Sequence, residues 1–263
     1  IGSSTSCVAA DIASDKVLSK KLLYNQNIPV AKGTRVYNII NLLKEVEEIG
    51  YPVVLKPRYG SKGKGVILNI KNEQELVRKY NASRKLYKDL IVEKYIEGND
   101  YRVCVVDYSV VAVSHRIPPY IIGDGIHNIK YLIMKLNEDP MRGIDHEKPL
   151  TKIKIDNEML IELKNKNMSL SYIPKKNEKI NLRENGNIST GGIAVDCTDI
   201  ICEENIDICI RAARAIGLDI CGIDIKTKDI SKPIYNEGVV VEVNAAPGIR
   251  MHIEANLLML EKR

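Results

Sequence analysis

The chain has 263 residues, with 39 Lys or Arg against 34 Asp or Glu, which gives a formal net charge of +5. This length allows one large domain or two smaller ones that share a cleft. The basic excess is small and spread along the chain. Because no basic stripe with interleaved aromatic residues is present, nucleic-acid binding is not expected.

The sequence shows no pattern typical of a targeting signal. No apolar run has the length of a membrane span and no signal-peptide pattern occurs, so we expect a cytoplasmic protein without membrane contact. The six cysteines form no C-x-x-C pair, which favours reduced, buried thiols over zinc or disulfides. The first residue is Ile rather than Met, so the chain is expected to be part of a longer protein with neighbouring domains.

The first predicted helix begins after Asp15, a good N-cap residue, and ends before Pro29. Lys16 lies in its first turn, where a solvated lysine is the simpler interpretation. A second helix is predicted over residues 39–49 and ends at Gly50. A short buried strand follows, with Lys56 at its end before Pro57.

A glycine-rich loop comes directly after this strand. Residues 58–66 read R-Y-G-S-K-G-K-G-V, so three glycines alternate with two lysines. Glycine lets the backbone approach a ligand closely, and lysines with free backbone amides suit phosphate oxygens. The loop matches neither common nucleotide-binding motif, and a plain hairpin turn is the alternative.

The middle of the chain is predicted to contain a helix over residues 72–86, a strand over 90–96 and a hairpin of strands 101–106 and 109–117. Arg102 and Arg116 lie on the hairpin, where either can hold an anionic group through two parallel hydrogen bonds.

Residues 123–192 are more polar. His127 precedes a helix that begins near Ile129, where a capping role is the more common case for such a histidine. Residues 137–190 are predicted to be irregular apart from a helix at 157–167. The loop at 182–192 is rich in glycine and hydrogen-bonding groups, which is typical of a substrate-facing loop.

The C-terminal part carries the clearest chemical signal. A helix over residues 205–216 leads into a strand with Asp224, and a second strand places Glu242 and Asn244 two residues apart. Side chains two apart on a strand share a face, so these oxygens are expected to converge. Such hard oxygen donors suit Mg²⁺. A solvated face of an edge strand is the alternative.

The order of these signals resembles the ATP-grasp superfamily of carboxylate–amine ligases, over residues 16–251. The stretches are D-K at 15–16, V-V-L-K-P at 53–57, the glycine-rich loop, V-E-K-Y-I-E-G-N-D at 92–100 and E-V-N-A-A-P-G at 242–248. Within the superfamily, N-I-S-T-G-G at 187–192 and residues 213–224 resemble the ATP-grasp domain of the cyanophycin synthetases. The bifunctional glutathione synthetases are also similar in this loop.

The resemblance implies roles position by position. It implies ATP and Mg²⁺ as cofactors. Positions that match nucleotide-binding residues are Lys16, Lys56, Ser61, Lys62, Gly63, Gly65, Glu93, Lys94, Ile96 and Asp100. Positions that match the magnesium ligands are Asp224, Glu242 and Asn244. Arg102 and Arg116 match residues near the transferred phosphate, and the acceptor is assigned to Ser189, Thr190, Gly191 and Arg250. The family often has His or Gln where Lys62 stands.

The fold implied by the resemblance is an α+β ATP-grasp fold with the nucleotide between two lobes, residues 1–95 and 96–263. The leading hypothesis is a ligase that works through an acyl phosphate and adds aspartate to a poly-aspartate primer. A glutathione-synthetase-type ligase and an ATP-binding module that is inactive without its partner domains are the alternatives. A homo-oligomer is compatible with this reading.

Overall fold

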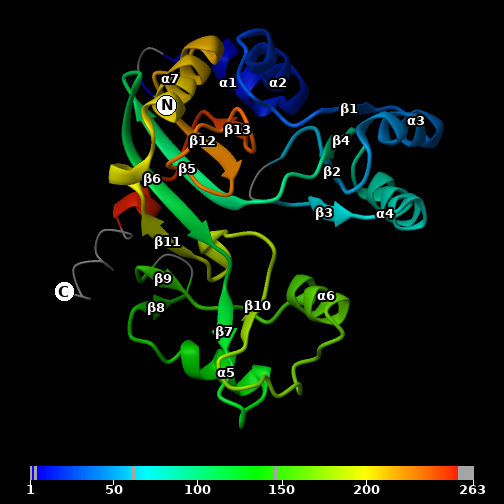
Figure 1. The fold of residues 1–263 in the computed structure, drawn as a ribbon, viewed down its shortest axis with the longest axis vertical. Helices are drawn as coiled ribbons and strands as arrows, with labels where there is room; N and C mark the ends of the chain where they lie inside the picture. Colours follow the sequence, from blue (N-terminus) through cyan, green and yellow to red (C-terminus); the bar gives the residue numbers. More distant parts are fainter. Residues whose placement is uncertain (1, 3–4, 61–62, 145–146, 254–263) are drawn as a thin grey trace. The chain divides into compact units, whose positions relative to one another are not determined.

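The computed structural model describes residues 2, 5–60, 63–144 and 147–253, and its elements are shown in Figure 1. The chain separates into two compact units. The first comprises the chain up to Val113 together with Cys197–Ile249, and the second comprises Ser114–Asp196 together with the chain from Arg250. The predicted lobe boundary at residue 95 stays a prediction.

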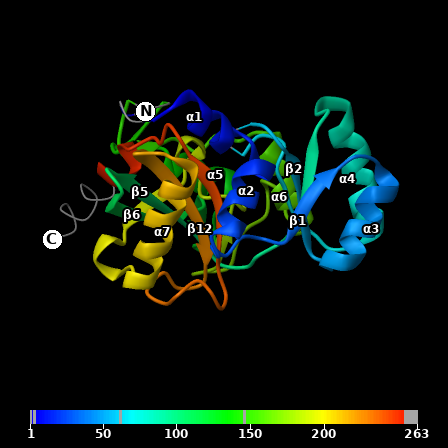
Figure 2. The ribbon, with the colours of Figure 1, turned by 90° about the horizontal axis from the view of Figure 1, so that it is seen from above.

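The first unit contains an antiparallel sheet with strand order β1-β4-β2-β3. Helices α3 and α4 belong to the same part of the unit (Figure 2), and their apolar faces join the strands in one core that includes Leu42, Leu55 and Leu76. The elements of this part are β1 (Gly33–Val36), α3 (Ile39–Ile49), β2 (Val53–Pro57), β3 (Ile67–Ile70), α4 (Glu73–Leu86) and β4 (Leu90–Lys94).

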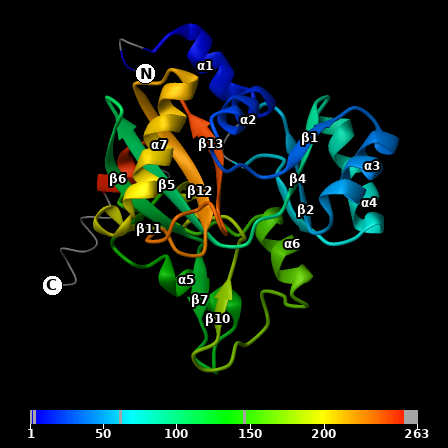
Figure 3. The same cartoon turned by 45° about the horizontal axis from the view of Figure 1, so that its top comes forward.

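A second core in the first unit is built on strands β5, β12 and β13. Helix α7 packs on β5 and β12 (Figure 3), and it contributes Ile208, Cys209 and Ala212 to the core. The elements around this core are α1 (Cys7–Ser14), α2 (Lys16–Asn25), β5 (Asn99–Val106), η2 (Thr198–Ile200), α7 (Glu203–Ile216), β12 (Ile220–Thr227) and β13 (Val239–Asn244).

Strand β6 (Ser109–Ile117) continues from the first unit into the second, and its sheet has the order β11-β6-β5-β12-β13. The second unit has its own core, which includes Ile121, Ile129 and Met159. Its elements are β7 (Tyr120–Ile122), α5 (Ile129–Leu136), β8 (Arg142–Gly143), β9 (Leu150–Thr151), α6 (Asn157–Asn165), β10 (Lys179–Asn181), η1 (Ile188–Thr190) and β11 (Ile193–Asp196).

The predicted helices and the hairpin are found close to their expected bounds. The hairpin turns at Asp107 and Tyr108, whose positive φ angles of 49° and 54° are those of a tight two-residue turn. Two features differ from expectation. Helix α1 lies in a segment for which no helix was predicted, and three short strands lie between residues 137 and 190. In the part of the chain that the structure describes, no helix is both long and apolar enough to cross a bilayer.

Candidate functional site

One face of the β5–β12–β13 sheet is polar, and the opposite face is core. In the strand register Asp224 is opposite both Arg102 and Glu242, and Gly222 is opposite Asn244. Directly opposite residues share a face, as do residues two apart along a strand. The structure therefore brings Asp224, Glu242 and Asn244 together, while Ile223 and its neighbours fill the core beneath them.

Asp224 and Arg102 form a buried ion pair on this face. The Arg102 Nε donates to Asp224 Oδ1, and its Nη2 lies 3.3 Å from Asp224 Oδ2. Burial opposes the charge of Arg102, but Asp224 and, to a smaller extent, Glu242 outweigh it and raise the pKa of the guanidinium above its ordinary value. The cation is therefore fixed beside the two carboxylates.

The donor set on this face fits a hard divalent cation. Asn244 Nδ2 donates to the Gly222 carbonyl at 3.3 Å, which leaves its Oδ1 as an oxygen donor beside the carboxylates of Asp224 and Glu242. Two carboxylates and one amide oxygen are ligands that Mg²⁺ accepts. No cluster of three His, Cys, Asp or Glu side chains with metal-binding geometry occurs among the described residues, so the amide is needed to complete the set.

Lys16 joins three parts of the first unit. It is the first residue of α2, and its Nζ donates to the carbonyl of Gly60 at 2.7 Å. The same Nζ lies 3.4 Å from Glu242 Oε1. The ammonium group therefore sits between the start of the glycine-rich loop and one of the predicted metal ligands.

Lys56 is held by a buried carboxylate that also binds a lysine missed by the sequence analysis. Lys56 Nζ lies 2.9 Å from Glu93 Oε2, and Lys20 Nζ contacts the other oxygen, Oε1. Burial disfavours the Glu93 carboxylate, but the two ammonium groups outweigh burial, so the pKa of Glu93 lies below its ordinary value. Burial lowers the pKa of Lys20, although Glu93 opposes that shift. Lys20 is four residues after Lys16 on α2, and this helical spacing was the available signal.

The side chains predicted to lie at the adenine hinge and the ribose make different contacts. The Lys94 Nζ donates to the carbonyls of Gly50 at 3.1 Å and Tyr51 at 2.8 Å, so its side chain holds the end of α3. Ile96 is half-buried just beyond β4. The Asp100 carboxylate faces Lys226 on β12, with both oxygens 3.3 Å from Nζ. The side chain of Lys94 is thus engaged structurally, and its backbone amide donates to the Lys32 carbonyl at 2.7 Å. The hinge role of Lys94 stays a prediction.

The glycine-rich loop is partly described. Ser61 and Lys62 lie outside the described residues. Gly63 and Gly65 have positive φ angles of 73° and 72°, which glycine adopts without strain. A Cβ on Gly65 would lie 2.6 Å from the ring of Tyr87, so the end of the loop lies against the C-terminus of α4.

The remaining predicted residues belong to the second unit. Arg116 lies on β6 opposite Ala194 of β11. Ser189 and Thr190 lie in η1, whose N-cap Asn187 accepts from the Ser189 amide.

Gly191 ends η1 with φ 99°. Its carbonyl lies 3.4 Å from Nη1 of the buried Arg142, which also donates to the Thr151 carbonyl at 2.7 Å. Arg250 donates to the Lys148 carbonyl. The loop predicted to bind the acceptor is therefore held at Gly191 by a buried arginine.

His127 has a local partner. Asp124 Oδ1 accepts from the His127 amide at 2.8 Å, and Asp124 Oδ2 lies 2.6 Å from the imidazole Nδ1. The ring also stacks on Tyr131 with centroids 4.0 Å apart. These contacts hold the pKa of Asp124 below its ordinary value, mainly through the hydrogen bond from the His127 amide. The histidine stabilises the turn before α5.

Comparison with known proteins agrees with the fold. The structure is similar over 99% of the chain to part of a bifunctional glutathione synthetase from Pasteurella multocida, with a TM-score of 0.65, 25% identity and 37% of that chain covered. It also resembles a D-alanine–D-alanine ligase from Bacillus anthracis, with a TM-score of 0.56, 15% identity, and 97% of this chain and 68% of that chain covered. The predicted α+β ATP-grasp fold is therefore confirmed.

The sequence relatives define the family. The RimK-like ATP-grasp domain matches residues 13–119 and 174–259. The chain belongs to the RimK-like ATP-grasp family. It is 44% identical over 255 residues to a cyanophycin synthetase of Trichormus variabilis, which covers 95% of this chain and 28% of the relative. It is 32% identical over 255 residues to a glutathione biosynthesis bifunctional protein of Clostridium perfringens, which covers 95% of this chain and 33% of the relative. The chain thus spans about a third or less of these relatives.

Proposed function

We propose that this chain is an ATP-dependent carboxylate–amine ligase that adds aspartate to the C-terminal carboxylate of a poly-aspartate chain. The observation that carries the proposal is the convergence of Lys16 with Asp224, Glu242 and Asn244 in the first unit. Two carboxylates and an amide oxygen suit a divalent cation, and an adjacent ammonium suits phosphate. The similarity to cyanophycin synthetases supports aspartate and a poly-aspartate primer as the substrates.

The residues suit phosphoryl transfer better than nucleophilic catalysis by the protein. A carboxylate becomes reactive when it takes the γ-phosphate of ATP to form an acyl phosphate, and an amine then displaces phosphate to form the amide. Positioning and charge neutralisation supply most of the catalysis in such transfers. Asp224, Glu242 and Asn244 would hold Mg²⁺, which supplies charge neutralisation to the phosphates. Lys16 and Lys56 would bind phosphate oxygens.

Arg102 and Arg116 are the proposed catalytic residues. Arg102 is held in one orientation by Asp224, so its guanidinium is preorganised, which lowers the cost of stabilising charge that develops during transfer. The loop with Gly63 and Gly65 would exclude water, because hydrolysis of the acyl phosphate wastes the ATP. Glu93, Lys94, Ile96 and Asp100 remain the proposed contacts to adenine and ribose.

The test is ADP release by the purified chain with Mg²⁺, ATP, aspartate and a poly-aspartate primer. We expect release that depends on both aspartate and primer. If γ-glutamylcysteine with glycine drives release and the primer does not, the chain is a glutathione-synthetase-type ligase. If a non-hydrolysable ATP analogue binds by calorimetry and no acceptor drives release, the chain is an ATP-binding module that needs the neighbouring domains of a longer protein.

A further inference from the structure

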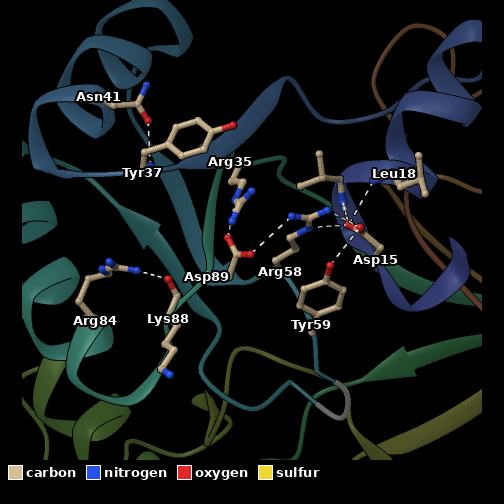
Figure 4. Close-up of polar contacts among 11 residues, drawn as sticks. Asp15, Leu18, Arg35, Tyr37, Asn41, Arg58, Tyr59, Arg84, Lys88 and Asp89 are labelled. Carbon is tan, nitrogen blue, oxygen red and sulfur yellow. Dashed lines mark hydrogen bonds and ion pairs between the residues drawn. The ribbon is translucent and has the colours of Figure 1, made fainter. Parts of the chain in front are cut away.

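A chain of ion pairs in the first unit connects residues that the proposed function leaves unused (Figure 4). Arg58 follows β2 and precedes the glycine-rich loop. Its Nε donates to Asp15 Oδ1 at 2.8 Å, its Nη2 to Asp15 Oδ2 at 2.5 Å, and its Nη1 lies 3.5 Å from Asp89 Oδ2. Arg35 on β1 donates to the other Asp89 oxygen at 2.6 Å. Four guanidinium nitrogens, three from Arg58 and one from Arg35, therefore contact the two carboxylates.

The backbone of Arg58 is fixed by the same neighbours. Its amide donates to the Asp89 carbonyl at 3.0 Å, and its carbonyl accepts from the Lys16 amide at 3.4 Å. Asp15 is also the N-cap of α2, because its Oδ1 accepts from the amides of Val17 and Leu18 at 3.0 and 3.2 Å. One carboxylate therefore caps the helix that begins with Lys16 and holds the residue that starts the loop.

The residues of this cluster are close in sequence to the lysines that are proposed to bind phosphate. Arg58 is two residues after Lys56, and Asp15 directly precedes Lys16. Tyr59 adds to the cluster, since its hydroxyl lies 3.3 Å from Asp15 Oδ2 and the Arg58 guanidinium lies 5.0 Å from its ring centroid. Gly60 follows Tyr59, and its carbonyl accepts a hydrogen bond from the Lys16 ammonium.

We propose that Asp15, Arg58 and Asp89 are positioning residues that fix Lys16, Lys56 and the start of the glycine-rich loop as one phosphate-binding unit. The inference rests on the proposed function. None of the three needs to touch the nucleotide. The two-nitrogen fork from Arg58 to Asp15 sets the distance between the start of α2 and the end of β2, and Asp89 fixes the guanidinium from the side of β4.

The test compares three variants with wild type in the full chain. Asp15→Asn keeps a good N-cap residue but loses the charge. Arg58→Lys keeps the charge but loses the fork, and Asp89→Asn removes the charge of the lateral partner that Arg58 shares with Arg35. The matched control is Asp156→Asn. Asp156 caps α6 through the Met159 amide and accepts from Arg183 Nη2 at 2.5 Å, so it is likewise an N-cap carboxylate paired with an arginine, in the second unit.

Nucleotide affinity is measured by calorimetry with a non-hydrolysable ATP analogue and Mg²⁺, at a temperature where every variant is folded. We expect a loss of about tenfold for Asp15→Asn and Arg58→Lys, since a hydrogen bond to a charged group is worth roughly one factor of ten or more in an equilibrium constant. Asp89→Asn is expected to lose less, and Asp156→Asn to bind like wild type. Hydrogen exchange should show faster exchange at the amides of Lys16 and Arg58 in the first two variants.

The outcomes separate this proposal from the function on which it rests. If wild type binds the analogue and Arg58→Lys binds it equally well, the cluster is structural only and the positioning role is overturned. If wild type does not bind the analogue, the proposed function fails, and with it the positioning role. Unchanged exchange at Lys16 and Arg58 in Arg58→Lys would show that the fork does not anchor this segment, whatever the affinity.

Discussion

Glu93→Gln should destabilise the first unit strongly, because the Glu93 carboxylate is the shared partner of the buried Lys56 and the half-buried Lys20. Glu93 is 4% exposed, and Lys56 is 5% exposed. Its two oxygens bind Lys56 and Lys20 separately. Removing one partner of a buried ion pair leaves a charge without compensation, at a cost of about 3–5 kcal/mol. A domain is typically stable by roughly 5–15 kcal/mol, so this change would remove a large part of the total.

The assay is urea unfolding of wild type and Glu93→Gln at neutral pH, with the free energy of unfolding taken from the midpoint and slope. The control is Glu237→Gln, because the Glu237–Lys228 pair has both side chains 63% exposed and should contribute between zero and about 1 kcal/mol. The double variant Lys20→Gln/Glu93→Gln should recover part of the loss, since one uncompensated ammonium is removed. If Glu93→Gln costs no more than Glu237→Gln, the two lysines do not depend on this carboxylate and the reasoning is wrong.

Three further outcomes are expected. Glu242→Gln should weaken the dependence of nucleotide affinity on Mg²⁺, because one predicted ligand loses its charge. The measurement is calorimetry with and without the ion, and an unchanged dependence would show that Glu242 is not a metal ligand. Arg58 lowers the pKa of Asp15 from 3.8 to about 2, mainly through its hydrogen bond, so the stability that the Asp15 charge supplies is complete above about pH 4 and is lost as pH falls towards 2. The difference in unfolding free energy between wild type and Asp15→Asn should shrink over that range, and a constant difference would contradict the assignment. Burial raises the pKa of the Cys221 thiol to about 12, so in the folded protein a thiol reagent should label exposed Cys7 first, and Cys221 only on unfolding.

Local signals were sufficient for most helices and for the hairpin. Asn72 caps α4 as predicted, with its side chain accepting from the Glu75 amide, and Gly217 ends α7 in the left-handed conformation. Helix α1 was missed because its core contacts are the small residues Ala9 and Ala13, which give a weak apolar period. The two-residue strands β8 and β9 are defined only by pairing with each other, which no local pattern encodes.

Some residues of the candidate site could also be predicted from local patterns, and others could not. Glu242 and Asn244 were paired by the period of a strand, which is a local rule. Arg58 was placed only in the glycine-rich loop, because its partners Asp15 and Asp89 lie 43 and 31 residues away along the chain. The function of an arginine in such a loop is ambiguous until its carboxylate partners are known. Long-range pairing of charges is therefore what the structure adds to the sequence.

Four cations of the candidate site, Lys16, Lys20, Lys56 and Arg102, have one property in common that bears on how ligands bind. Lys16 lies beside Glu242, Lys56 and Lys20 share Glu93, and Arg102 binds Asp224. Each of these cations thus already contacts a carboxylate, and Lys56 and Lys20 share one. A nucleotide phosphate that takes Lys16 would leave Glu242 without its counter-charge, and a metal ion that takes Glu242 would release Lys16. Since each ligand removes the cost of binding the other, the two should bind with positive coupling, and by thermodynamic necessity the coupling is the same whichever ligand arrives first. The expected coupling therefore rests on one salt bridge, between Lys16 and Glu242.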